Sequence, residues 1–485
     1  MLTGALPEWE IRRGAATESV VVLSEGTGGS MSVKPLTALA FSVALVIVFT
    51  SAAAAAPGVT ELVSVRSNGK QGDGISARAS APSASANGLV VAFDSAATNL
   101  VGGDTNGALD VFMRDRSSGR TERVSVSSKG REGNGGSAGP AVSDDGRFVA
   151  FDSSASNLVP GDTNGRTDVF VRDRLTGVTT RASVAADGTQ ADNVSFGAAI
   201  SADGRLVAFV SDASNLVAQP ASGRQVYVED RVTGGIERVS VSSAGEPAQG
   251  FTTPPAISGD GRVVAFAAGA SNLVPDDTNG QLDVFAHDRV TATTERVSVD
   301  SAGAQAADGS SFLADLDGDG SVVAFASEAS NLAAGDTNGV RDAFVHDRVT
   351  GVTERVSVDS AGGQGDGQSV GPGIRGGSAF GPSVSADGRL VAFDSIATNL
   401  VTGDTNLCDP FYRTTPGECP DVFVHDRLTG ATVRVSVDSA GGQANAASTD
   451  PDISADGSTT AFFSAATNLV AVDTNGFPDV FVHVG

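Results

Sequence analysis

Short apolar runs separated by polar turns recur along this chain at a nearly fixed interval. Each run contains an Ala-Phe pair, and the seven phenylalanines are Phe93, Phe151, Phe209, Phe266, Phe325, Phe393 and Phe462. Successive gaps between them are 58, 58, 57, 59, 68 and 69 residues. A repeat of this length predicts one structural unit stacked many times, because each unit buries its apolar faces only against its neighbours.

The second repeat shows the internal pattern most clearly, with four strand candidates and no helical period. We expect its strands at 140–143, 147–153, 168–174 and 179–184. The second and third are continuously apolar, which predicts strands covered on both faces. The fourth alternates polar with apolar residues and belongs at an outer rim. Sheets stacked face to face around an axis cover their middle strands in this way.

The positions of the outer strands predict how the array closes. Six outer strands follow a third strand, at 121–126, 179–184, 236–241, 294–299, 353–358 and 432–437, whereas the seventh repeat ends at Gly485 without one. The missing strand is found at the other end, as Thr60–Val65. Pairing it with the last repeat removes two exposed sheet edges. We therefore predict an all-β fold over residues 57–485, a seven-bladed β-propeller of four-stranded antiparallel blades closed by its N-terminal strand.

The motif Ser-x-Asp-Gly-Arg-x-Val-Ala-Phe, as at 201–209 and 385–393, resembles the repeat of TolB-like propellers, which are relatives of WD-repeat proteins. The resemblance covers residues 59–485, with seven matches in register. It implies a periplasmic or secreted binding platform, although related propellers also occur in lyases and as gating domains of peptidases. The chain departs from the family by inserting Asn-Leu-Val-x-Gly-Asp-Thr-Asn-Gly between the second and third strands, so the resemblance assigns no role to that insert.

The first 56 residues differ in composition from the repeats. Met31 and Lys34 precede an apolar stretch from Leu36 to Thr50 and a small-residue run that ends at Ala56, the order of a secretory signal. We interpret 1–30 as a misplaced start or an extension and 31–56 as a cleaved signal peptide. An uncleaved signal anchor is the alternative. Cleavage would leave a monomer without a membrane span, secreted or outside the cell membrane, and periplasmic if the host has an outer membrane.

The net charge of −25 narrows the class of partner. A surface this acidic repels phosphate backbones, which argues against nucleic acid, and it attracts divalent cations. An Asp-Thr-Asn-Gly-x-x-Asp loop supplies hard oxygens at positions 1, 3 and 7, as calcium loops do. Turn formation by the Asp and Asn side chains explains the same residues equally well. The predicted calcium ligands are Asp104, Asn106 and Asp110; Asp162, Asn164 and Asp168; Asp277, Asn279 and Asp283; Asp336, Asn338 and Asp342; and Asp473, Asn475 and Asp479.

Two blades depart from this loop and one adds to it. Blade 3 loses the motif, and blade 6 keeps Asp404 and Asn406 but is interrupted by an insertion. Blade 5 carries a second acidic loop, which adds the predicted calcium ligands Asp315, Asp317 and Asp319.

The insertion in blade 6 holds both cysteines of the chain. Cys408 and Cys419 are expected to form a disulfide that closes this short loop, because exported proteins favour that state. The same loop carries Phe411, Tyr412 and Arg413, an aromatic and basic cluster of the kind found at binding hot spots. We predict that these three residues contact a partner.

No catalytic motif stands out. The four histidines, His287, His346, His425 and His483, share one repeat position that elsewhere holds Arg or Glu, which indicates a solvated surface site. Asp-Arg pairs such as Asp115-Arg116 are interpreted as turns with a local ion pair. A catalytic channel would need unmatched acids on the innermost strands, which are small and neutral apart from Asp450 and Asp452.

Two hypotheses for function follow from these residues. We favour an exported, non-enzymatic propeller that binds a protein or glycan partner and is stabilised by calcium. The alternative is a propeller enzyme, a polysaccharide lyase or hydrolase, with its site in the central channel.

Overall fold

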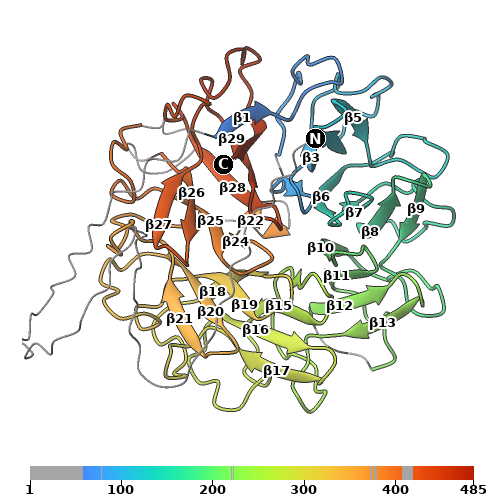
Figure 1. Cartoon of the computed structure of the whole chain (residues 1–485). Coiled ribbons are helices and arrows are strands. Elements are labelled where there is room, and N and C mark those ends of the chain that lie inside the picture. The colour runs from blue at the N-terminus through green and yellow to red at the C-terminus, as the bar shows by residue number, and fades with distance from the viewer. Residues whose placement is uncertain are drawn as a thin grey trace, which may run out of the picture. The chain divides into compact units, whose positions relative to one another are not determined.

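The computed structural model describes residues 58–485 apart from 78, 220, 222, 372–373, 376–377, 380 and 407–418. Within that part, the strands form seven four-stranded sheets and one two-stranded sheet. The seven sheets follow one another around a central axis in chain order, from blue to red (Figure 1). The predicted seven-bladed β-propeller is confirmed. No helix among the described residues is long and apolar enough to cross a membrane.

Every blade has the same order of strands from the axis outward. The innermost strands are β2 (Ser83–Ala84), β6 (Ser137–Val142), β10 (Ser195–Ile200), β14 (Ala256–Ile257), β18 (Ser311–Leu316), β24 (Ser383–Val384) and β28 (Ser448–Ile453). The second strands are β3 (Val90–Ser95), β7 (Phe148–Ser153), β11 (Leu206–Ser211), β15 (Val263–Ala268), β19 (Val322–Ser327), β25 (Leu390–Ser395) and β29 (Thr459–Ser464).

The outer half of each blade is equally regular. The third strands are β4 (Asp110–Asp115), β8 (Asp168–Asp173), β12 (Gln225–Asp230), β16 (Asp283–Asp288), β20 (Asp342–Asp347), β26 (Asp421–Asp426) and β30 (Asp479–Val484). The outer strands of blades 1 to 6 are β5 (Arg120–Arg123), β9 (Val178–Arg181), β13 (Gly235–Arg238), β17 (Thr293–Arg296), β21 (Val352–Arg355) and β27 (Ala431–Arg434), and that of blade 7 is β1 (Val59–Leu62). The separate pair is β22 (Ile374–Arg375) and β23 (Ser378–Ala379).

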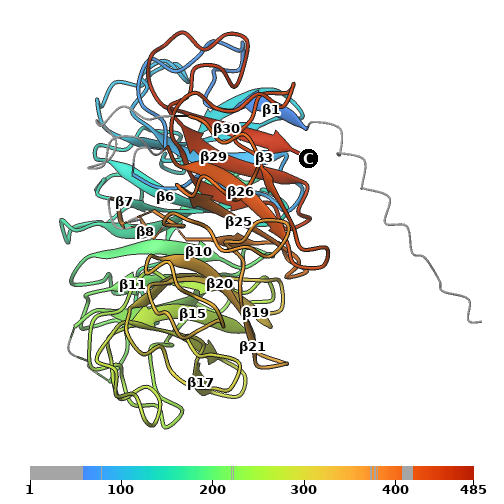
Figure 2. The same cartoon turned by 90° about the vertical axis from the view of Figure 1, so that its left-hand side faces the viewer.

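Strand β1 closes the ring, as predicted. It pairs antiparallel with β30, with Val59 opposite Val484 and Leu62 opposite Phe481, and the two strands lie side by side in Figure 2. A second closure runs around the axis, where backbone N–H groups in each inner turn donate to a carbonyl in the turn of the next blade. Its seven links run from Ala86 to Asp144, Asp144 to Ala202, Ala202 to Gly259, Asp260 to Gly318, Gly318 to Ala386, Ala386 to Ala455 and Asp456 to Ala86.

The outer strands are shorter than predicted. In blade 2 the strand ends at Arg181, although the alternation continues to Val184. Beyond that arginine the chain leaves the ladder, because the Ser183 hydroxyl donates to the Asp168 carboxylate (2.6 Å) and Val184 pairs with Gln190 in the following loop. The prediction of 60–65 for the first strand is wrong at its end for the same reason, since Ser64 bonds to Asp479.

Stacked aromatic rings form the centre of every blade. The Phe of each Ala-Phe pair lies against an aromatic residue of the third strand, as in Phe151 and Phe170, whose ring centroids are 5.9 Å apart. Blade 3 uses Phe209 and Tyr227 at 6.1 Å. These rings are fully buried, because the second and third strands are covered on both faces by neighbouring blades. Removing one such ring would cost about 3–5 kcal/mol.

The interpretation of the histidines as solvated is wrong. Each is buried, and its Nδ1 lies 2.8–2.9 Å from a threonine hydroxyl, as for His287 and Thr294. Thr294 in turn donates to the Val241 carbonyl of the preceding blade (2.5 Å), so the histidine nitrogen is the donor to threonine. Arg114 and Arg172 make the same contact to their threonines. In these six blades the shared feature is a donor to the threonine that bonds to the preceding blade, whereas blade 3 has Glu229 opposite Ile236.

The Asp-Arg pairs form the predicted turns, but the prediction of a local ion pair within them is wrong. Asp115 accepts hydrogen bonds from Ser117 and Ser118 and so caps its own turn. Arg116 instead reaches Glu61 of the preceding outer strand (2.9 Å). Four further arginines bridge blades in the same way, through the pairs Arg174–Glu122, Arg289–Glu237, Arg348–Glu295 and Arg427–Glu354.

Candidate functional site

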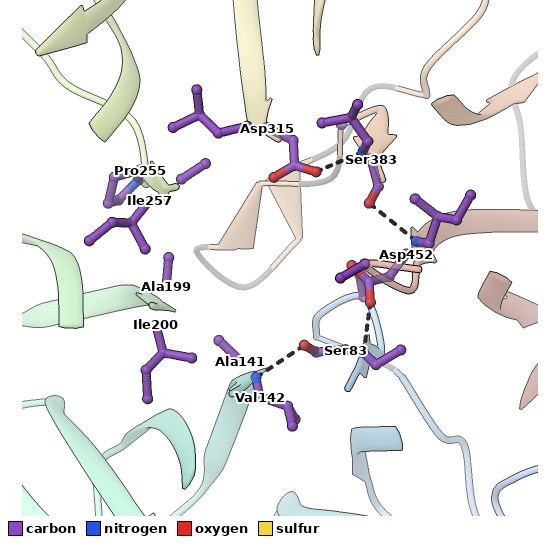
Figure 3. Close-up of a pocket in the computed structure, with 18 of the residues that line it drawn as sticks. Ser83, Ala141, Val142, Ala199, Ile200, Pro255, Ile257, Asp315, Ser383 and Asp452 are labelled. Carbon is purple, nitrogen blue, oxygen red and sulfur yellow. Dashed lines mark hydrogen bonds between the residues drawn. The ribbon is translucent and has the colours of Figure 1, made fainter. Parts of the chain in front are cut away.

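The innermost strands surround a cavity of about 330 Å³ on the propeller axis. One residue per blade occupies the same position on these strands, opposite an alanine of the second strand. In chain order these channel residues are Ser83, Ala141, Ala199, Ala256, Asp315, Ser383 and Asp452. Blades 5, 6, 7 and 1 are therefore polar at this level, whereas blades 2, 3 and 4 carry alanine. The channel has one polar side and one apolar side (Figure 3).

Each polar channel residue is held by the backbone of the next blade. Asp315 accepts a hydrogen bond from the Val384 N–H (2.9 Å), and Asp452 accepts one from Ala84 (2.7 Å). The hydroxyls of Ser383 and Ser83 accept from the next blade in the same way, each at 3.2 Å. These bonds fix the side chains before any ligand arrives.

Burial shifts the ionisation of both channel carboxyls towards neutrality. The pKa of Asp315 is raised to about 6, chiefly by burial, although hydrogen bonds from Val384 and Leu316 oppose the shift. The pKa of Asp452 is raised to about 7, again chiefly by burial and then by the charge of Asp315. Near neutral pH these carboxyls can therefore accept a hydrogen bond or carry a proton.

Sequence reasoning identified Asp452 as a channel exception but assigned Asp315 to an acidic loop. The structure separates the three acids of that loop. Asp317 replaces the usual serine of the inner turn and accepts from the Val322 N–H (3.1 Å), and Asp319 caps the turn through the Ser321 N–H (2.9 Å). The sequence could have placed Asp315 in the channel only through the pairing of the first and second strands. Asp315 lies opposite Ala324, as Asp452 lies opposite Ala461, and each alanine precedes the Phe of its Ala-Phe pair. Asp450, the other exception, lies at a bulge of β28 with a φ of 57°.

The predicted calcium loop of blade 1 gathers acids around an arginine. The carboxylates of Asp104, Asp110 and Glu132 lie within 4.8 Å of one another, the spacing of a metal site. Nη1 of Arg123 lies 3.5, 2.9 and 2.5 Å from these three carboxylates. Asn106 donates to Asp110 (3.2 Å) and closes the turn. A guanidinium therefore supplies positive charge where the sequence predicted calcium.

The same cluster, an arginine of the outer strand between two aspartates of the loop, recurs in four other blades. N–O distances across these clusters run from 3.2 to 3.7 Å. The groups are Arg181 with Asp162 and Asp168, Arg296 with Asp277 and Asp283, Arg355 with Asp336 and Asp342, and Arg434 with Asp404 and Asp421. Asn164, Asn279 and Asn338 donate to the second aspartate as Asn106 does. Calcium binding at these loops stays a prediction.

Blade 7 keeps the two aspartates but not the arginine. Leu62 of β1 lies opposite Phe481, the position that Arg123 holds opposite Phe112 in blade 1. Asp473 accepts from the Gln71 amide (3.0 Å), and Asp479 accepts from Ser64 (2.5 Å) and Asn475 (2.7 Å). Among the described residues neither aspartate forms an ion pair. Burial raises the pKa of Asp479 to about 7.

The predicted partner-contact loop falls on residues outside the described part of the chain. This applies to Cys408 and to Phe411, Tyr412 and Arg413. Cys419 is described, and it is buried and disulfide-bonded. The contact surface stays a prediction.

Comparison with known proteins finds propellers. No protein-family model and no curated protein sequence matches this chain. A solved oligogalacturonate lyase in complex with manganese aligns with a TM-score of 0.51 at 12% identity, covering 88% of this chain and 98% of that one. An oligogalacturonate lyase from Vibrio parahaemolyticus gives 0.49 at 13% identity, with the same coverage. TolB from Acinetobacter baumannii gives 0.36 at 14% identity, covering 67% of this chain and 59% of TolB. By fold, this chain is a seven-bladed β-propeller that has TolB and oligogalacturonate lyases among its structural neighbours.

Proposed function

We propose that this protein is an exported, non-enzymatic binding propeller that holds a protein or glycan partner at its central channel. The observation that carries the proposal is the break in sevenfold symmetry at the channel position, where Asp315, Ser383, Asp452 and Ser83 form one polar side. A site defined by carboxylate and hydroxyl oxygens favours a ligand rich in donors, such as sugar hydroxyls or an ammonium group. The facing alanines leave room and an apolar wall.

A double variant tests this proposal. Asp315→Asn with Asp452→Asn keeps the size of both side chains and an oxygen for each backbone N–H, but removes the charge. We expect a neutral glycan or a lysine peptide, whichever the wild-type protein binds in a screen, to bind at least tenfold more weakly to the variant. Ala141→Ser on the apolar side is the matched control and should bind like wild type. Equal affinity for the double variant would reject the channel as the binding site.

A channel enzyme is the second candidate, and one observation favours it. Asp315 and Asp452 are unmatched acids on innermost strands, with pKa values raised to about 6 and about 7. Such values suit general acid or base chemistry near neutral pH. Incubation with acidic and neutral polysaccharides, followed by detection of new reducing ends or unsaturated products, separates the two functions. Product formation that the double variant abolishes would replace the binding proposal with the enzyme.

Calcium stabilisation is a separate proposal. Unfolding temperatures with calcium and with a chelator test it, and an increase with calcium is expected if any loop binds the ion. Identical temperatures would reject it and leave the channel proposal unaffected.

A further inference from the structure

Neighbouring blades are joined near the outer edge of the propeller by the same hydrogen bonds in six of the seven interfaces. A threonine of the outer strand donates its hydroxyl to a carbonyl of the preceding blade and its N–H to a serine hydroxyl there, as Thr294 does to Val241 (2.5 Å) and Ser243 (2.9 Å). A histidine or arginine of its own blade donates to the threonine. We call these contacts the rim bonds. Their threonines are Thr60, Thr121, Thr179, Thr294, Thr353 and Thr432.

The interface between blades 2 and 3 has lost the groups that form the rim bonds. Ile236 stands at the threonine position of β13, and Ala186 stands at the serine position of blade 2, so neither side chain has a hydroxyl. Glu229 replaces the histidine or arginine. Within the described residues, no side-chain hydrogen bond therefore joins β13 to blade 2, whose outer strand is β9 (Figure 1).

Two buried polar groups at this interface are left without partners. In five blades the Nε of the arginine after the third strand donates to a glutamate of the preceding blade, as Arg289 does to Glu237 (2.6 Å). Thr180 stands at that glutamate's position in blade 2, and the Nε of Arg231 is buried with no partner among the described residues. One carboxylate oxygen of Glu229 is buried and unpaired in the same way. Such groups would gain hydrogen bonds to water if the blades separated.

Near the axis the same two blades remain joined. The Asp144 N–H of blade 2 donates to the Ala202 carbonyl of blade 3 (3.0 Å), a link that recurs around the ring. The Asp152 carboxylate accepts a hydrogen bond from the Gly197 N–H of the innermost strand of blade 3 (2.9 Å). The interface therefore has hydrogen bonds at its inner end but no rim bonds at its outer end.

Apolar packing holds the two blades together between the axis and the rim. Val171 of blade 2 belongs to one buried cluster with Val207 and Phe209 of blade 3. The guanidinium carbon of Arg231 lies 4.4 Å from the centre of the Phe148 ring of blade 2. These contacts are non-directional, so they close the interface without fixing the outer strands as the rim bonds do.

We propose that the outer strands of blades 2 and 3 separate while the inner strands stay joined, so that the ring opens at this interface and not where β1 closes it. At the closure, Thr60 keeps its rim bonds to Val437 and Ser439, and β1 pairs with β30. Separation exposes Arg231 and Glu229 to water, which supplies the partners they lack. The inference goes beyond the proposed binding function and does not depend on it.

Ionisation of Glu229 should favour the open form. Burial raises its pKa to about 7, the charge of Arg231 opposes this shift, and the charge of Asp230 adds to it. In water the carboxyl returns towards its ordinary pKa, so opening is least favoured at low pH and becomes more favoured as the pH rises through 7. The further charged groups that act on Arg231 are Asp173, Arg147 and Asp203.

Alkylation of an introduced thiol by iodoacetamide measures the opening under native conditions. Val171→Cys places the thiol in the blade 2–3 interface, opposite Thr180 of the outer strand. Val345→Cys is the matched control, because Val345 is equally buried at the same position of blade 5, whose interface with blade 6 keeps its rim bonds. We expect Val171→Cys to react at least tenfold faster than Val345→Cys at pH 7.5, and faster than it unfolds globally. Equal rates would overturn the proposal.

Restoring the rim bonds should close the interface. Ala186→Ser, Ile236→Thr, Glu229→His and Thr180→Glu give blades 2 and 3 the residues that join blades 3 and 4. Added to Val171→Cys, the four substitutions should slow alkylation at least tenfold. The smaller set Ala186→Ser/Ile236→Thr, which supplies only the hydroxyls, should slow it by less and replaces the larger set if that variant does not fold. An unchanged rate in a folded variant would overturn the proposal.

Glu229→Gln tests the pH dependence, because glutamine has a similar size and cannot ionise. After correction for the thiolate fraction of a model thiol, alkylation of Val171→Cys should become about tenfold faster from pH 6 to pH 8. The same variant with Glu229→Gln should lose this increase. An increase that persists with glutamine would overturn the assignment of Glu229 as the group that controls opening.

Discussion

Blades 3 and 7 have each lost one half of the same cluster. Blade 3 retains the arginine, Arg238, but its loop has no aspartates and Gln225 replaces the acid that starts the third strand. Blade 7 retains Asp473 and Asp479, but Leu62 replaces the arginine. Arg238 compensates locally, since its Nη2 donates to the Gln219 carbonyl and its guanidinium carbon lies 5.7 Å from the centre of the Tyr227 ring. Within the described part of the chain, the acids of blade 7 have only neutral donors.

This difference shows that the two halves of an ion-pair cluster are not equivalent when buried. An arginine left alone can extend its head to solvent or to a carbonyl, and its stem still packs. A buried carboxylate left alone must be protonated, hydrogen-bonded or paired with an outside cation. Burial raises the pKa of Asp479 to about 7, whereas Asp342, which keeps its arginine, has a pKa raised to about 6.

The largest effect should come from removing the feature that makes blade 7 different, its strand from the other end of the chain. A protein lacking residues 57–62 leaves β30 with an open edge and loses the contacts of Thr60 to His483 and to Val437. We expect the shortened chain to be unfolded or aggregated, as measured by circular dichroism and size exclusion. A monomer with wild-type unfolding behaviour would contradict the closed ring.

Replacing the outer-strand arginine of blade 5 by leucine, as in blade 7, should lower the unfolding free energy by a large amount, although by less than removal of β1. Arg355→Leu leaves Asp336 and Asp342 without their ion pair, and breaking a buried pair costs about 3–5 kcal/mol of unfolding free energy. Arg238→Leu in blade 3 is the matched control and should cost under about 1 kcal/mol, since no acid faces it. Urea unfolding at pH 7.5 measures both. Equal losses would mean that the arginines act through packing alone.

Asp152, on the second strand of blade 2, tests how burial alone affects a carboxyl that has no arginine partner. Asp152 accepts from the Gly197 N–H (2.9 Å), and none of the described residues donates to its other oxygen. Burial raises its pKa to about 8, above the unfolded value, so its stabilising contribution is present below about pH 4 and is lost as the pH rises to 8.

Asp152→Asn cannot ionise, so it removes this loss of unfolding free energy at high pH. We expect the variant to be more stable than wild type at pH 8 by several kcal/mol, with the difference vanishing near pH 4. Unfolding free energies measured from pH 4 to 8 show the trend. The comparison must be made between variant and wild type, because the buried histidines, with lowered pKa values, act in the opposite direction. A difference independent of pH would contradict ionisation as the cause.

The smallest effect should come from completing blade 7. Leu62→Arg gives Asp473 and Asp479 the outer-strand arginine that the equivalent aspartates of blade 5 have in Arg355. The substitution should raise the unfolding free energy by about 1 kcal/mol at pH 7.5. The gain is modest because the guanidinium must be desolvated. Thermal melting against Leu62→Met measures it. A decrease in stability would mean that blade 7 cannot accommodate an arginine side chain at the position of Leu62.

The fold could be predicted from sequence because its signals are short-range. The Ala-Phe pairs mark a strand covered on both faces. The outer strand that the seventh repeat lacks is found at Thr60, ahead of the first repeat. The limits of the outer strands could not be predicted, because the alternation continues past Arg181 while the Ser183 hydroxyl bonds to Asp168.

The sites were less predictable because they depend on register between strands. Arg123 and Asp110 are thirteen residues apart and meet only across the β4–β5 ladder. A signal for this cluster was present: an arginine occupies the same place in six outer strands and Leu62 replaces it in the seventh. The histidines were misread because tolerance of Arg, Glu and His at one position suggested solvent, whereas His287 and Arg114 share a donor role.

The pairing of β1 with β30 also governs when the protein can finish folding. Val59 is among the first described residues to be synthesised, and its ladder partner Val484 is among the last. The first strand must therefore remain unpaired until β30 has been made, and a chain terminated before β30 has no strand to close the ring. Only a polypeptide that includes β30 can therefore become a native ring.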